Sequence, residues 1–163
     1  MEKQTLNWDN SLEDVVAKYS NMVYKLAVCQ MRNKNDADDI FQEVFFRYVK
    51  TRPCFDSEEH RKAWLIRVTV NCCKSMYSSA WLKKIVPLDD TITFETKEEN
   101  DLFSELQKLP LKYRMVIHLF YYEDMSIDDI CMALNKKPSA VKMQLLRARK
   151  MLKEIIKEED FYV

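Results

Sequence analysis

The chain has 163 residues, 26 basic against 26 acidic residues, and no glycine. Most phosphate-cradling and dinucleotide-binding loops need glycine to let the backbone approach the ligand, so a P-loop or a Rossmann fingerprint is excluded. With 47% hydrophobic residues, the chain can form a folded core. Tight β-hairpin turns usually need glycine, which the chain lacks, so the composition predicts a protein of the all-α class.

Two amphipathic helices are expected first. Apolar residues recur at helical spacing over residues 12–27, with Ser11 as a candidate cap, and again over 37–49, with Asp36 as cap. Phe46 falls off the second apolar stripe. The polar face of the second helix is interpreted either as a protein-docking surface or as solvated helix surface. That face carries Asp38, Asp39, Gln42, Glu43 and Arg47, and Phe46 is either a tolerated exposed aromatic residue or a further contact with a partner protein.

A basic third helix should follow Pro53, starting after Ser57 as its cap and running towards Trp81. Residues 61–84 hold six basic and no acidic residues. A narrow apolar seam around Trp64, Leu65, Val68, Cys72 and Met76 is expected to leave one polar set outside it: Arg61, Arg67, Asn71, Lys74, Ser75 and Ser78. On the same helix, Tyr77 and Trp81 could stack unpaired bases or pack within the protein.

The next segment, residues 85–100, is acidic, contains Pro87 and shows no sustained period, which is typical of a linker. We therefore predict two small helical domains, residues 1–84 and 101–163, joined by this acidic linker.

The second domain carries a helix-turn-helix pattern. Ser126, with Asp129 three residues later, should cap a short helix that ends at Leu134. Asn135 is expected in the left-handed conformation, since asparagine is the best substitute for a turn glycine. A longer helix follows, and residues 135–153 hold seven basic and no acidic residues.

The last helix exposes residues suited to reading DNA. Arginine and glutamine can address base edges in a major groove, whereas lysines and the helix N-terminus suit phosphates. An ordinary amphipathic helix is the alternative interpretation. The candidate residues are Ser139, Ala140, Met143, Gln144, Arg147 and Lys150 on one stripe, flanked by Lys136, Lys137 and Lys142.

Other chemistry has little support. Five cysteines without a C-x-x-C pair and two histidines do not make a zinc site, so we expect buried thiols and no metal or cofactor. Acidic residues near the start of the second helix are explained by the helix dipole, and we expect neither catalysis nor a small-molecule substrate. The chain has no signal peptide or apolar span, so a cytoplasmic location is expected.

Three segments resemble bacterial RNA polymerase sigma factors of the small, two-domain, extracytoplasmic-function (ECF) type. The family's helix for the coiled-coil clamp of the polymerase β′ subunit resembles DADDIFQEVFFRYVK, residues 36–50. Its promoter-melting and minus-ten-reading helix is similar to AWLIRVTVNCCKSMYSSAWLKK, residues 63–84. Its minus-thirty-five-reading domain, which also sits on the polymerase β flap, is similar to LPLKYRMVIHLFYYEDMSIDDICMALNKKPSAVKMQLLRARKML, residues 109–152.

The resemblance implies a transcription initiation factor that recruits core RNA polymerase to promoter DNA and assists melting. The polar face of the second helix would meet the polymerase, the linker would thread its active-site channel, and the last helix would read the minus-thirty-five element. The loop 51–57 would hold a flipped base. An anti-sigma factor is the family's usual further partner. The implied minus-ten residues are Phe55, Ser57, Arg61, Lys62, Arg67, Asn71, Lys74, Ser75 and Ser78.

Two rival functions stay open from the residues alone. A stand-alone helix-turn-helix regulator would bind duplex DNA without polymerase and would not need the polar face of the second helix. A helical adaptor that binds only proteins would not need the basic charges of Lys136, Lys137, Lys142 and Arg147.

Overall fold

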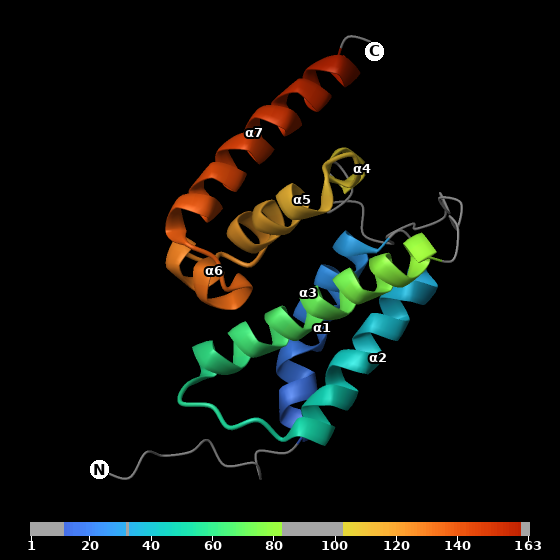
Figure 1. Ribbon diagram of the computed structural model, residues 1–163, viewed down its shortest axis with the longest axis vertical. Coiled ribbons are helices and arrows are strands. Elements are labelled where there is room, and N and C mark those ends of the chain that lie inside the picture. Colours follow the sequence, from blue (N-terminus) through green and yellow to red (C-terminus); the bar gives the residue numbers. More distant parts are fainter. Residues whose placement is uncertain (1–11, 32, 83–102, 161–163) are drawn as a thin grey trace. The chain divides into compact units, whose positions relative to one another are not determined.

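The computed structural model describes residues 12–31, 33–82 and 103–160 (Figure 1). Within these ranges every regular element is a helix and no strand occurs, so the predicted all-α class is confirmed. The helices fall into two compact units, α1 to α3 and α4 to α7. The predicted acidic linker, residues 85–100, lies outside the described residues, and the proposed domain boundaries stay a prediction.

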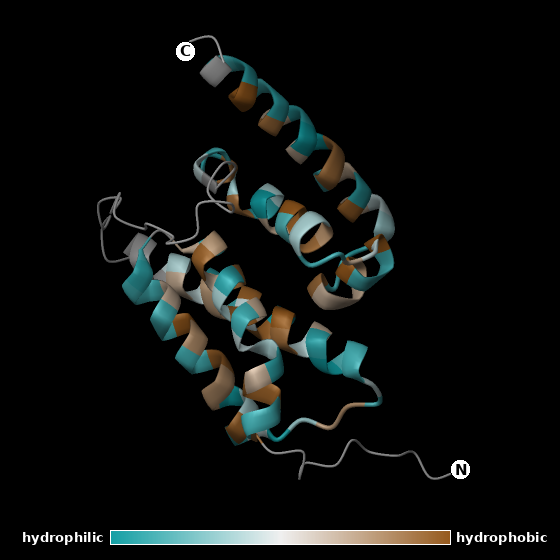
Figure 2. Ribbon diagram, turned by 180° about the vertical axis from the view of Figure 1, so that it is seen from behind, coloured by the Kyte–Doolittle hydropathy of each residue, from teal (hydrophilic) through white to brown (hydrophobic). Residues whose placement is uncertain are grey.

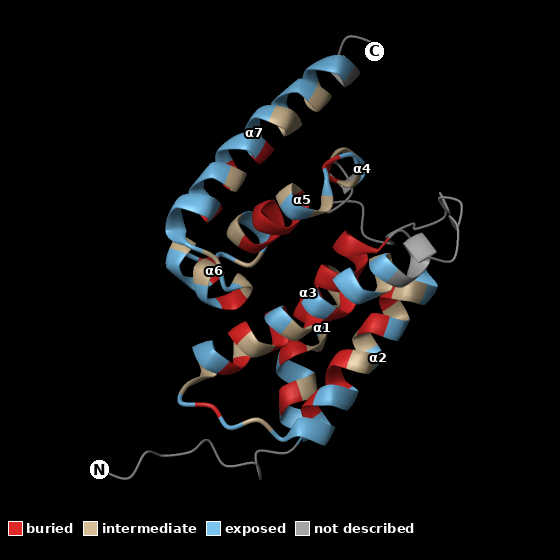
Figure 3. Ribbon diagram, in the orientation of Figure 1, coloured by how far each residue is buried: buried red, intermediate tan, exposed pale blue. Residues whose placement is uncertain are grey.

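The first unit is a three-helix bundle of α1 (Leu12–Gln30), α2 (Lys34–Thr51) and α3 (Glu58–Leu82). Each helix packs against the other two, and Figure 3 shows buried residues on all three. Removing these apolar side chains from water is the main stabilising contribution to the unit. Its most deeply buried side chains include Val23, Leu26, Ile40, Val44, Leu65 and Ile66.

The start of α2 differs from the prediction. Asn33, not Asp36, is the N-cap: its Oδ1 accepts the backbone N–H of Asp36 at 2.8 Å. The Asp36 carboxylate accepts from Asn33 Nδ2 at 2.7 Å, and its charge lies in the first turn, where the helix dipole favours it. Arg52, with φ 47°, ends α2 in the left-handed conformation directly before Pro53.

The third helix is buried over a wider face than the narrow seam expected. Ile66, Thr69 and Cys73 are also buried, because α3 packs against both α1 and α2 and two neighbouring faces leave water. Arg61, expected outside the seam, is buried as well. The other polar residues expected outside it are exposed: Arg67, Asn71, Lys74, Ser75 and Ser78.

The second unit contains α4 (Phe103–Gln107), α5 (Leu111–Ile117), the π-helical turn η1 (His118–Tyr122), α6 (Ile127–Leu134) and α7 (Pro138–Asp160). Helix α7 packs against α4, α5 and α6. Figure 2 shows hydrophobic and hydrophilic residues alternating around α7, as expected of an amphipathic helix. The buried core includes Leu106, Leu109, Val116, Leu119, Ile130, Val141, Leu145 and Ala148.

The helix-turn-helix and its local signals are confirmed. Ser126 Oγ accepts the backbone N–H of Asp129 at 3.1 Å, and Asp129 Oδ2 accepts that of Ser126 at 3.3 Å, which completes the capping box. Asn135 ends α6 with φ 53°. Pro138 is the first residue of α7. A backbone N–H at this position would have no acceptor within the helix, so proline, which lacks one, loses no hydrogen bond.

The described residues contain neither a membrane span nor a metal cluster. None of their helices combines the length and apolar character needed to cross a bilayer. In the same part of the chain, no three histidine, cysteine or acidic side chains gather as metal ligands would. All five cysteines are thiols; Cys29, Cys72 and Cys73 are buried and Cys54 is exposed.

Candidate nucleic-acid interface

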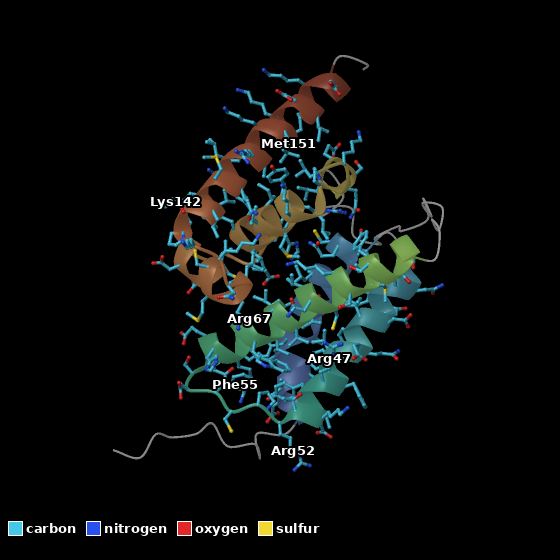
Figure 4. The ribbon with its side chains drawn as sticks, viewed as in Figure 1. Arg47, Arg52, Phe55, Arg67, Lys142 and Met151 are labelled. Atoms are coloured by element: carbon cyan, nitrogen blue, oxygen red, sulfur yellow. The ribbon has the colours of Figure 1, made fainter. Side chains whose placement is uncertain are left out.

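One side of α7 carries most of the residues expected to meet DNA. Val141, Leu145 and Ala148 are buried on the opposite side, so the predicted orientation of the helix within its unit is confirmed. Lys142, labelled in Figure 4, is exposed, as is Lys137 in the preceding turn. We name the exposed set the α7 stripe; it consists of Ser139, Ala140, Met143, Arg147 and Lys150.

The α7 stripe combines the groups that read base edges. Arg147 offers a planar fork of N–H donors, which matches the O6 and N7 acceptors of guanine. Ala140 and the 45%-exposed Met143 offer apolar atoms that suit the thymine methyl group. Lys150 and the flanking lysines are point charges suited to phosphates. An exposed helix of this composition fits a major groove.

Gln144 differs from the rest of the predicted set because it is only partly exposed. Its Oε1 accepts a hydrogen bond from Lys136 Nζ at 3.2 Å, across the turn that precedes α7. Reading adenine takes both the oxygen and the nitrogen of a glutamine amide. With its oxygen engaged by Lys136, Gln144 is better placed to hold that lysine at the start of α7.

Arg149 was not among the predicted residues, although it is one of the seven basic residues of the segment 135–153. Its Nε donates to Tyr121 Oη at 2.7 Å. Its guanidinium carbon lies 5.5 Å from the ring centre of Phe120 and 5.6 Å from that of Tyr121. Three consecutive aromatic residues, 120–122, precede this basic segment and could have indicated a cation contact. That the contact is with Arg149 can be seen only in the folded structure.

The exposed polar residues of α3 form a second candidate surface. Their spacing of three and four residues places them on one side of the helix. Lys62, five residues before Arg67, lies about 140° around the helix from it and is half-buried. Two cations and several hydroxyl and amide groups, without an acidic residue, suit a nucleic-acid backbone. We name this set the α3 stripe; it consists of Arg67, Asn71, Lys74, Ser75 and Ser78.

Phe55 does not join the α3 stripe, because its side chain is only 3% exposed. It stacks on Tyr48 with the ring centres 6.3 Å apart and meets Trp64 edge-on at 6.0 Å. The Arg61 guanidinium lies 5.5 Å from its ring centre. These contacts anchor the loop between α2 and α3 from the inside.

Ser57 also has a structural role. Its Oγ accepts the backbone N–H of His60 at 3.1 Å and so caps α3, as predicted. The imidazole of His60 packs edge-on against Phe55, with ring centres 5.3 Å apart. The loop is therefore held at both its apolar residue and its junction with α3.

Glu58 connects this loop to α1. Its carboxylate accepts from Tyr19 Oη at 2.6 Å and Arg61 Nη1 at 2.8 Å, and Lys18 Nζ lies 3.5 Å away. Burial raises the pKa of Glu58, but the Tyr19 hydrogen bond and the charges of Arg61 and Lys18 outweigh it and leave the pKa below its usual value. Burial and the same hydrogen bond raise the pKa of Tyr19. The ionised network stabilises the junction of α1 with α3.

Tyr77 is engaged within the first unit. Its hydroxyl donates to the backbone carbonyl of Gln30 at 2.6 Å and ties α3 to the end of α1. This contact favours packing over base stacking for Tyr77. The side chain of Trp81 lies outside the described residues.

The outer side of α2 forms a third surface. Phe46 is 61% exposed, and Arg47, labelled in Figure 4, donates from Nε to Glu43 Oε1 at 2.7 Å. This hydrogen bond raises the pKa of Arg47. An exposed aromatic ring among paired charges suits a protein partner better than DNA. We name the six predicted residues the α2 face: Asp38, Asp39, Gln42, Glu43, Phe46 and Arg47.

Comparison with known proteins identifies the two units. The family model for Sigma-70 region 2 matches residues 15–83, and that for Sigma-70, region 4 matches residues 100–152. RNA polymerase sigma factor SigV of Bacillus subtilis is 29% identical over 144 residues, covering 84% of this chain and 86% of that protein. ECF RNA polymerase sigma factor SigW of the same species is 26% identical over 171 residues, covering 91% and 90%.

Solved structures agree on the fold. The sigma factor RpoE from Bartonella quintana, in complex with the anti-sigma factor NepR, matches with TM-score 0.72 and 18% identity over 89% of this chain and 96% of that one. CnrH in complex with the cytosolic domain of CnrY matches with TM-score 0.70 and 24% identity over 92% and 90%. With both sigma-70 regions matched in order, the chain belongs to the sigma-70 family as an RNA polymerase sigma factor of the ECF type, a transcription initiation factor that directs the polymerase to promoters.

Proposed function

We propose that the α7 stripe reads the minus-thirty-five promoter element in the major groove. The observation that carries this is the exposure of Arg147 and Met143 on the last helix of a capped helix-turn-helix, within a segment, residues 135–153, that holds seven basic and no acidic residues. Arg147 contributes base reading, and Lys136, Lys137 and Lys142 contact phosphates.

The α3 stripe, in the same proposal, contacts the single strand at the minus-ten element, and Lys62 contacts it separately, near the start of α3. The loop 51–57 receives the flipped base. Because Phe55 within this loop and Arg61 on α3 are buried and in contact with each other, their part is to hold the shape of the loop rather than to touch the strand. A loop fixed before binding loses less conformational entropy when it receives the base.

The α2 face would dock on the coiled-coil clamp of the β′ subunit, and the second unit on the β flap. Phe46 is the expected anchor because exposed aromatic residues are frequent hot spots of protein interfaces. The polymerase carries out the chemistry, and this chain supplies recognition and strand separation. An anti-sigma factor is a further expected partner, since the sigma factor RpoE from Bartonella quintana was solved with one.

A reconstituted holoenzyme tests the proposal. Purified chain is mixed with bacterial core RNA polymerase, and the complex selects duplexes from a random-sequence library, which are then sequenced and transcribed. We expect two enriched elements about two helical turns apart and transcription from a fixed point downstream. Selection of duplexes by the chain alone, with no polymerase complex, would favour a stand-alone regulator. A polymerase complex that enriches no sequence would refute promoter reading.

Two variants separate base reading from phosphate contact. Arg147→Ala should cost about 1–3 kcal/mol and relax the preference at one promoter position. Lys137→Ala should weaken binding by a similar factor on all sequences and lower the salt dependence. Equal losses on every sequence from both variants would contradict base reading by Arg147.

A further inference from the structure

The pairing of Arg149 with Tyr121 joins the recognition helix to a distant part of its unit. The two residues are 28 positions apart, one on α7 and one on η1. The guanidinium uses an N–H for the Tyr121 hydroxyl and lies near the faces of Phe120 and Tyr121 at 5.5 and 5.6 Å. A planar guanidinium is suited to both contacts at once, and a lysine ammonium is not.

The π-helical turn provides these aromatic rings. Glu123 N–H donates to the His118 carbonyl at 3.2 Å, which closes the wider turn. The turn lies just before α6, the first helix of the helix-turn-helix. Arg149 therefore links α7 to the segment that leads into the other half of the motif.

Arg149 and the α7 stripe lie on different sides of the helix. Arg149 immediately precedes Lys150, a member of the stripe, and so lies about 100° around the helix from it. Both are exposed. Charge alone would count both as phosphate contacts, but Arg149 is engaged by the aromatic rings of its own unit.

We infer that Arg149 is a positioning residue, which fixes the rotation of α7 through Tyr121 and Phe120 so that the α7 stripe meets the base edges. This inference rests on the proposed minus-thirty-five recognition. It excludes Arg149 from the phosphate contacts of the basic block. Because Val141, Leu145 and Ala148 also hold α7 in place, loss of the pairing should weaken recognition without unfolding the unit.

The experiment measures binding of the holoenzyme to its library-selected duplex over a series of salt concentrations. Arg149→Ala and Arg149→Lys should each weaken binding about tenfold, since lysine keeps the charge but not the planar contact. Tyr121→Phe should weaken it in the same direction with no change in charge. None of the three should change the slope of affinity against salt. Lys150→Ala should lower that slope by about one.

Lys112→Ala is the matched control, because Lys112 is an exposed cation of the same unit, on α5, and its ammonium lies over the ring of its neighbour Tyr113. It should bind as the parent chain does. Parent-like affinity for Arg149→Lys or Tyr121→Phe, or a smaller salt dependence of binding for Arg149→Ala, would overturn this inference but not the proposed function. A parent holoenzyme that selects no duplex would overturn the proposed function and this inference with it.

Discussion

Replacing Tyr19 with phenylalanine removes one hydroxyl and tests whether the Glu58 network stabilises the first unit. The hydroxyl donates to the Glu58 carboxylate at 2.6 Å. Hydrogen bonds to charged groups contribute about 1.5–3 kcal/mol when shielded from water. The Glu58 side chain is 39% exposed, so water competes and we expect a loss of about 1 kcal/mol for Tyr19→Phe at neutral pH.

The effect should depend on pH. The folded-state pKa of Glu58 lies below its usual value of 4.5, so the stability from its ionised form is fully present above that value and is lost as the pH falls through the folded pKa. A protonated Glu58 is a weaker acceptor for Tyr19. The difference in unfolding free energy between Tyr19→Phe and the parent chain should therefore shrink at an acid pH below the folded-state pKa of Glu58.

Urea unfolding followed by tryptophan fluorescence measures this. All three tryptophans, Trp8, Trp64 and Trp81, precede residue 91 in the sequence, so the signal reports on the first unit. A loss of about 1 kcal/mol moves the urea midpoint by about 0.5 M for a slope of about 2 kcal/mol/M. Lys18→Ala is the matched control, because the Lys18 side chain is 60% exposed and 3.5 Å from Glu58, and should change stability little. An unchanged midpoint for Tyr19→Phe, or an equal loss at both pH values, would refute the reasoning.

Three further predictions address other parts of the molecule. Phe46→Ala should leave thermal unfolding within about 0.5 kcal/mol of the parent chain, since the ring is 61% exposed. The same variant should bind core polymerase at least tenfold more weakly in a titration, and unchanged binding would count against the α2 face. Asn135→Ala should destabilise the second unit by about 1 kcal/mol in calorimetry, because alanine tolerates φ 53° poorly, whereas Asn135→Gly should not; equal stability of the two would show that the turn relaxes. Iodoacetamide should alkylate exposed Cys54 first and buried Cys73 only after unfolding, because burial raises the pKa of the Cys73 thiol to about 12. Mass spectrometry of timed samples reads the order, and early alkylation of Cys73 would contradict it.

Local patterns in the sequence determined much of the second unit. The capping box of Ser126 with Asp129 and the left-handed Asn135 follow from interactions within a few residues, so they could be predicted before the fold was known. The periodicity of Val141, Leu145 and Ala148 placed the α7 stripe on the outside for the same reason. Two basic blocks and three segments resembling the sigma-factor family indicated the function.

The sequence did not identify the N-cap of α2, where two neighbouring residues can both cap the helix. Asn33 and Asp36 are both good capping residues, and the choice of Asp36 was wrong. Asn33 caps the helix and Asp36 accepts its side-chain amide, an arrangement that serves both residues. Single-residue preferences do not separate these two starts, which lie within one turn of each other.

Only the tertiary structure decided which polar residues serve the fold. Arg61 is buried and donates to Glu58, whose carboxylate also accepts a hydrogen bond from Tyr19 on a different helix. Arg149 is engaged by Tyr121 across 28 residues. A basic block shows where positive charge accumulates along the chain, but whether each cation meets a partner inside the protein or remains for DNA depends on how the helices pack.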